Sequence, residues 1–204
     1  MRAQILWFPL TAALLVAACD RPAIDASQSL VGAKQLPGAK TLRQEIIQLN
    51  RSYGGASSSL LSYELGPDNG LTVTVTHRDP DTWKDITDAK ETSNLSTQTA
   101  SQARNELWRL RPEALQGVEE RVSPADCPTP PTDTFPIAAV VFIAKGTKPG
   151  INDRVAVVDV PAQYTCDTLQ GRAARNLIEK VLQQFPHSKV AAEFDRRRPT
   201  VVIP

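Results

Sequence analysis

The spacing of apolar residues along the chain predicts three helices. Apolar side chains recur every three or four positions over 41–50, over 95–110, and from Asp167 or Thr168 to Phe185. This spacing places them on one face of a helix, where they can pack against a core. A proline follows the second and third stretches closely and ends each helix.

Other segments have the patterns of β-strands. Segments 60–65 and 71–77 flank the turn sequence GPDNG, and the second alternates apolar residues with threonines, which predicts an antiparallel hairpin. Segments 137–146 and 153–162 are almost continuously apolar and predict a second hairpin, central in the sheet. A short edge strand is expected within 199–204.

Two long connections are expected to lack regular structure. Residues 78–94 are mainly polar, and residues 121–136 include five prolines. Taken together, the elements predict an α+β fold, an antiparallel sheet built from two hairpins with about three helices packed mainly on one face. The length of residues 39–204 fits a single domain.

The first residues form a leader. Arg2 is followed by a mainly apolar run over 5–15, which is typical of a secretory signal and too short for a stable membrane span. The next residues, Val16-Ala17-Ala18-Cys19, resemble the lipobox of bacterial lipoproteins. The resemblance implies that residues 1–18 are removed and that Cys19 carries palmitate or similar acyl chains as the first residue of the mature protein.

A lipidated Cys19 implies a protein anchored in the bacterial cell envelope and facing the periplasm. Two or more acyl chains make a stable anchor, whereas one binds only marginally. Asp20 resembles the signal that retains lipoproteins in the inner membrane of enteric bacteria. Residues 19–38 are rich in Pro, Gly, Ala and Ser and are predicted to form a flexible tether. An ordinary signal that leaves Cys19 as a thiol is the alternative.

The charge balance argues against nucleic acid as a partner. The chain has 23 basic and 22 acidic side chains, and the leader holds one of the basic ones, so the mature chain is formally neutral. Nucleic-acid binders need a basic face, because contacts with phosphates dominate their affinity.

The two remaining cysteines, Cys127 and Cys166, are predicted to form a disulfide, since an even pair in an oxidising envelope is typically bonded. The alternative is a free catalytic or metal-binding thiol. No CxxC spacing and no neighbouring histidine support that alternative.

Acidic residues gather after His77 and raise the question of a metal site. The segment continues with Asp79, Asp81, Asp85 and Asp88. A histidine with several carboxylates can bind a divalent cation, but the ligand spacing of an EF-hand is absent. Aspartates in such loops usually form turns. We therefore predict no metal site.

Catalytic signatures are weak. Asp159 is the one acid within an apolar run, where burial can raise the pKa of a carboxyl group, but near a strand end it more often satisfies backbone groups. No phosphate loop, dinucleotide motif or metal-cysteine spacing is present, and we expect no cofactor. An enzyme acting on the cell wall or on carbohydrate, using Asp159 or the segment from His77 to Asp88, remains the third hypothesis.

Aromatic residues favour binding over catalysis. Trp83 lies in a polar segment, where an exposed aromatic ring can anchor a protein interface, and Tyr53 and Tyr63 are candidates for the rim of that interface. We therefore expect a protein-binding module, not an enzyme. One version is an immunity or inhibitor protein against an envelope-acting enzyme, and the second hypothesis is an accessory or assembly subunit of an envelope complex.

Overall fold

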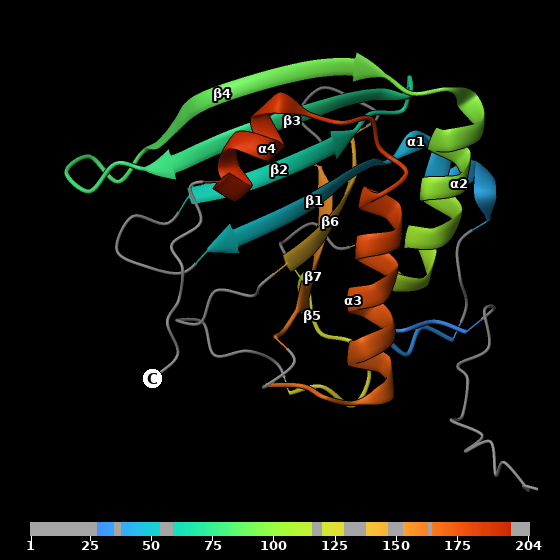
Figure 1. Cartoon of the computed structure of the whole chain (residues 1–204). Coiled ribbons are helices and arrows are strands. Elements are labelled where there is room, and N and C mark those ends of the chain that lie inside the picture. Colours follow the sequence, from blue (N-terminus) through green and yellow to red (C-terminus); the bar gives the residue numbers. More distant parts are fainter. Residues whose placement is uncertain are drawn as a thin grey trace, which may run out of the picture.

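The computed structural model describes residues 28–34, 38–53, 59–115, 120–128, 138–146, 153–162 and 165–196. Their elements, shown in Figure 1, are α1 (Ala39–Gln44), β1 (Ile46–Tyr53), β2 (Ser59–Leu65), β3 (Gly70–Arg78), β4 (Asp85–Asn94), α2 (Thr97–Leu107), the 3₁₀ turn η1 (Trp108–Leu110), β5 (Glu120–Val122), β6 (Ala138–Ala144), β7 (Arg154–Val160), α3 (Leu169–Leu182) and α4 (Lys189–Arg196).

Within these residues the strands form one seven-stranded sheet in the order β4-β3-β2-β1-β6-β7-β5. Neighbouring strands are antiparallel, except that β5 runs parallel to β7. The predicted α+β class with a mainly antiparallel sheet is confirmed. The sheet is larger than the two predicted hairpins, because β1 lies between them and β4 and β5 form its edges.

The predicted helix over 41–50 is wrong for most of its length. Only α1 is helical there, and β1 follows as a strand paired to β2 on one side and to β6 on the other. Ile47 and Leu49 are buried and alternate with half-buried neighbours, which is the period of a strand. Tertiary pairing on both edges of β1 therefore overrides a local pattern that also fits a helix.

The prediction that 78–94 lacks regular structure is also wrong. Residues 85–94 form β4, the edge strand beside β3, and none of its side chains is fully buried. Its half-buried positions, Ala89, Glu91 and Ser93, are mostly polar, so the sequence shows no alternation of large apolar residues that would predict a strand. The five-proline segment similarly contains β5, a short strand held by β7.

Part of the segment that was expected to form a flexible tether contacts the rest of the domain. Leu30 is fully buried in the core, its N–H donates to the carbonyl of Arg109, and its own carbonyl accepts from the N–H of Ala125. Residues 28–34 therefore pack against the domain. At the other end, α4 follows α3 and was not predicted, and the expected strand within 199–204 lies outside the described residues.

The main core lies between the sheet and three helices. It contains buried side chains of the sheet and of the three helices. Examples are Phe142 of β6, Leu107 of α2, Val181 of α3 and Phe194 of α4. A smaller apolar group, Ala139, Val141 and Val157, is buried on the other face of β6 and β7.

A buried ionic network joins the start of β1 to the helical layer. Arg111 holds both carboxylate oxygens of Glu45, at 2.6 and 2.9 Å, and the two residues are 5% and 2% exposed. Arg104 of α2 donates to the carbonyls of Glu45, Leu65 and Gly66. Burial lowers the pKa of Arg104, because it removes water from the charged guanidinium group. The three carbonyl groups replace part of that water by accepting its hydrogen bonds.

Candidate functional site

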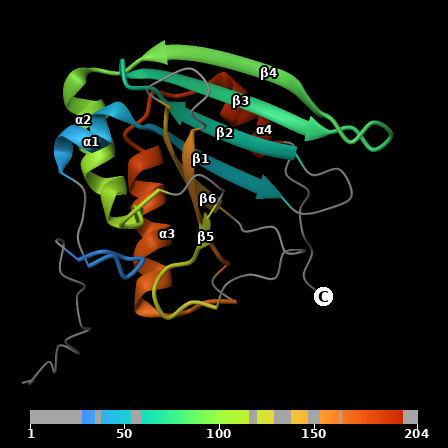
Figure 2. The same ribbon diagram turned by 180° about the vertical axis from the view of Figure 1, so that it is seen from behind.

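The feature of the molecule that stands out as a site is the hairpin of β3 and β4, which we call the arm. Figures 1 and 2 show from opposite sides that its tip projects beyond the ends of β1 and β2. Pairing of β3 with β2 ends at His77 and Ser59, whereas pairing with β4 continues to Arg78 and Asp85. The arm beyond His77 is thus a two-stranded ribbon in the described part of the chain.

The tip is closed by Asp79. Its N–H donates to the carbonyl of Lys84 at 2.9 Å, and its own carbonyl accepts from the N–H of Trp83 at 2.9 Å. Its carboxylate accepts from the N–H groups of Asp81 and Thr82 and from the Thr82 hydroxyl. These bonds, led by those from Thr82, hold the pKa of Asp79 below its ordinary value and fix the turn.

Trp83 is presented at this tip. Its side chain is 74% exposed, and its backbone has a φ of 57°, in the left-handed region. That conformation costs a residue with a Cβ about 1–2 kcal/mol and is normally left to glycine or asparagine. The Trp83 ring is exposed to water and adds nothing to the core, and its backbone is in an unfavourable conformation. Both features favour a role in binding over a role in stabilising the fold.

An ion pair and a side-chain hydrogen bond hold the strands of the arm together. Arg78 contacts Asp85 at 3.1 Å, and Nδ1 of His77 lies 2.7 Å from Asp88. The register of β3 and β4 shifts between Val75 and Thr76, where Asp88 of β4 is the extra residue without a partner in the register, as in a β-bulge. The carboxylates of Asp79, Asp85 and Asp88 are thus engaged in turn and strand contacts, and no group of three or more metal-ligating side chains forms among the described residues.

The base of the arm is fixed by α4. Glu91 of β4 accepts from the Ser188 hydroxyl at 2.8 Å and from the N–H of Lys189 at 3.0 Å, and Ser188 in turn caps the helix at Ala191. The bond from Ser188 and the helix N–H groups hold the pKa of Glu91 below its ordinary value. α4 packs on β3 and β4, so the end of the arm away from the tip is held against the rest of the domain.

The two tyrosines do not join Trp83 in one exposed surface. Tyr63 of β2 is 8% exposed and packs in the core, with its ring centroid 6.0 Å from that of Phe185. Its expected place on an exposed rim is wrong, because it lies on the buried face of β2 together with Leu61 and Leu65. Tyr53 ends β1, where its backbone pairs with Ser59, and its side chain lies outside the described residues.

Asp159 lies far from the arm in the sheet. It is on β7, which β2, β1 and β6 separate from β3, and it is 4% exposed. Its carboxylate contacts Arg121 of β5 at 3.2 Å, so its burial is compensated by an ion pair.

A hollow of about 350 Å³ lies between β1, the β6–β7 pair and α3. Arg51 and Arg175 line it, and neither Asp159 nor His77 is among its described lining residues. Arg51 contacts Asp195 at 3.4 Å, and Arg175 donates to the carbonyls of Pro161 and Cys166. The residues of the enzyme hypothesis are therefore not gathered in this hollow.

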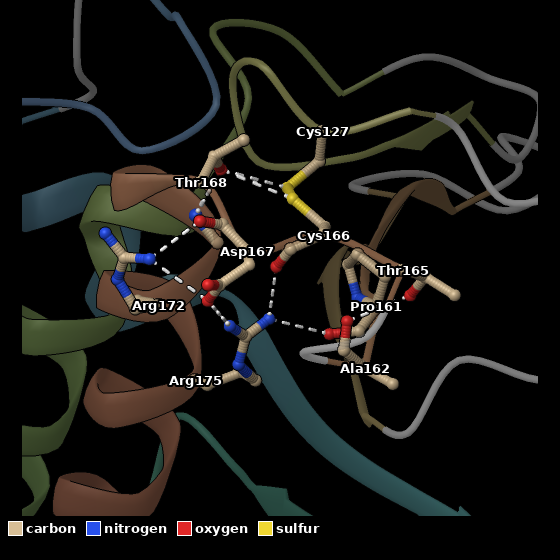
Figure 3. Close-up of a disulfide and its surroundings, with 10 residues drawn as sticks. Cys127, Pro161, Ala162, Thr165, Cys166, Asp167, Thr168, Arg172 and Arg175 are labelled. Carbon is tan, nitrogen blue, oxygen red and sulfur yellow. Dashed lines mark hydrogen bonds and ion pairs between the residues drawn. A yellow bond between two sulfur atoms is a disulfide. The ribbon is translucent and has the colours of Figure 1, made fainter.

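Cys127 and Cys166 form the predicted disulfide, shown in Figure 3. The bond ties the segment after β5 to the start of α3, where Thr168 caps the helix at Gly171. The Thr168 hydroxyl lies 3.5 and 3.3 Å from the two sulfurs. The disulfide therefore has a structural position, beneath the first turn of α3.

Cys19 and its leader lie outside the described residues, so the lipidation site stays a prediction. In the part of the chain that the structure describes, no helix has the length and apolar character needed to cross a membrane.

Sequence reasoning selected Trp83 as a candidate and predicted its place in a polar segment, but it missed the strand β4 and therefore the arm. Strand propensity is low in β4, and its contacts with Ser188, Arg78 and His77 depend on the three-dimensional register. One feature of the sequence could have indicated the hairpin. Asp79 and Pro80, which are typical turn residues, closely follow the strand pattern of 71–77.

Comparison of the sequence with known protein families and with curated proteins finds no match.

Proposed function

We propose that this protein is a lipid-anchored binding module of the bacterial cell envelope, and that it binds a protein partner through the arm. The observation that carries the proposal is the exposed ring of Trp83, held at the tip in a left-handed backbone conformation. Tryptophan is among the residues that contribute most to protein interfaces. A braced hairpin presents it without a large loss of conformational entropy on binding.

The shape of the arm supports binding over catalysis. Its tip is a projection, whereas catalysis needs a concave site that surrounds the substrate and excludes water. The proposal includes the expectation that the helices pack mainly on one face of the sheet. The main core, which joins the sheet to α2, α3 and α4, supports that expectation.

Attachment through Cys19 is part of the proposal and has its own test. Cys19→Ser should abolish labelling with radioactive palmitate and release the protein from the membrane fraction, because no acyl chain remains to bind the bilayer. Labelling that persists in this variant would show that the lipobox resemblance is misleading.

The binding function is tested by affinity capture from envelope extract. The bait is the chain from residue 20 onward, and an otherwise identical bait with Trp83→Ala is the matched control. We expect one protein in stoichiometric amount with the first bait and much less with the second. A soluble enzyme that loses activity in the complex would indicate an inhibitor, and several co-purifying membrane components would indicate an assembly subunit. Capture of no protein at all would contradict the proposal.

A further inference from the structure

The arm also indicates what kind of surface it fits. We infer that the partner presents a concave, positively charged site with an apolar pocket, into which the tip of the arm inserts Trp83. This inference rests on the proposed function and adds the chemistry of the partner.

The first support is the shape of the tip. Beyond the last pair with β2, the arm is two strands wide, and the loop between Asp79 and Lys84 closes it. A narrow, rigid projection with one large ring has little area for a flat partner. It fits a groove or cleft, as long loops of small binding domains do.

The second support is charge. Four carboxylates and two basic side chains lie between Arg78 and Asp88. Arg78 and Asp85 neutralise each other at 3.1 Å, which leaves three carboxylates and Lys84 in this segment, a formal net charge of −2. Hydrogen bonds from Thr82 keep Asp79 ionised, and the side chain of Asp81 is exposed. A complementary site therefore carries lysine or arginine around the pocket for the ring.

The same charge argues against the membrane as the occupant. Exposed tryptophan is common at membrane interfaces, where its ring lies among the headgroups. Anionic headgroups attract basic segments, and they would repel the net negative charge of residues 78–88. The lipid proposed at Cys19 would already supply the membrane contact. A protein cleft with basic side chains and an apolar pocket can accommodate the Trp83 ring and also attract the negative charge of the tip.

The inference is tested by photo-crosslinking in living cells of the source organism with the full-length chain. A benzoylphenylalanine replaces Ile86, which is 41% exposed on the arm and leaves Trp83 and the charges in place. The matched control has the same probe at Asn176, an exposed position on α3. We expect an adduct with one protein at Ile86 only, and the attached peptide should come from a concave surface with several lysines or arginines.

Two further variants separate the ring from the charge. Trp83→Gly keeps the tip folded, because glycine adopts a φ of 57° freely, and should weaken binding of the captured partner at least about 30-fold. Asp81→Lys should weaken it about 10-fold, mainly through slower association. Glu179→Lys, an exposed acid-to-base change on α3, should leave binding unchanged.

The outcomes distinguish this inference from the proposed function. A partner that is captured but forms no adduct at Ile86 would overturn both the arm as the binding surface in the proposed function and the basic cleft that rests on it, and would place the interface elsewhere on the domain. Adducts with lipid, an attached peptide from an acidic or flat surface, or a dissociation constant unchanged by Asp81→Lys would each overturn the basic cleft. If capture and crosslinking both yield nothing, the two proposals fail together.

Discussion

Gly171 shows at the scale of a single residue how closely the disulfide is packed. A Cβ atom added at this position would lie 2.8 Å from Sγ of Cys166 and 3.0 Å from Sγ of Cys127. Atoms at these distances overlap, so the first turn of α3 approaches the sulfurs only because residue 171 has no side chain. The helix thus contains glycine where alanine would favour helix formation.

Gly171→Ala should destabilise the protein by about 1–3 kcal/mol, although alanine normally stabilises a helix interior by about 1 kcal/mol relative to glycine. The measurement is the free energy of unfolding in urea. The same change in a Cys127→Ala, Cys166→Ala background should cost less, because both sulfurs are gone and only the contact of the added Cβ with the carbonyl oxygen of residue 166, at 3.0 Å, remains. An equal loss in both backgrounds would contradict the steric explanation.

At the scale of elements, the short helix α4 depends on a residue of the sheet. Glu91 places a carboxylate at the helix N-terminus, where the first N–H groups and the helix dipole favour a negative charge. Because the bonds from Ser188 and the helix N–H groups lower the pKa of Glu91 in the folded state, the ionised form is the one that stabilises the fold.

The contribution of Glu91 should therefore depend on pH. It is fully present above the ordinary value of 4.5 and is lost as the pH falls through the lowered pKa of the folded state. Thermal unfolding from pH 7 to pH 3 should show Glu91→Gln less stable than the natural protein at neutral pH, with the difference shrinking in acid. Glu179→Gln on α3 is the control. A difference that stays constant with pH would show that the charge has no role.

The strongly patterned elements could be predicted from the sequence. α2 and α3 have long apolar stripes, and β2, β3, β6 and β7 show clear alternation or continuous apolar runs, because each buries a whole face. β1 was mistaken for a helix because Ile46 and Leu49 also fit helical spacing. β4 was missed because an exposed edge strand needs no apolar residues.

The candidate site was predictable only in part. The exposure of Trp83 follows from its polar surroundings, and Leu61, Tyr63 and Leu65 alternate in a way that indicates the burial of Tyr63. Nothing in the sequence relates Glu91 to Ser188, which is 97 positions further along the chain. Contacts of that kind depend on the register of the sheet and on the position of α4.

At the scale of the whole molecule, the ionic network joins parts of the chain that are distant in sequence. Glu45 and Arg111 are 66 positions apart, and Arg104 adds the turn between β2 and β3. Buried charges of this kind are costly unless each is paired, so removing one partner leaves the other unsatisfied.

Glu45→Gln should lower the free energy of unfolding by about 3–5 kcal/mol, because the guanidinium of Arg111 then lies buried without a counter-charge. Urea unfolding measures this loss. The double variant Glu45→Met, Arg111→Met should recover much of it, since apolar side chains of similar volume fill the same space. A double variant no more stable than Glu45→Gln would show that Arg111 has further structural roles.

The burial of Leu30 limits how far the domain can stand from a membrane. Eleven residues lead from Cys19 to Leu30, and a fully extended chain of that length spans at most about 40 Å. Leu30 is held by backbone bonds to Arg109 and Ala125, so this length cannot increase without partial unfolding. If Cys19 is the lipid attachment point, Leu30 lies within about 40 Å of the bilayer, and a partner that binds the domain as proposed would have to do so close to the membrane surface.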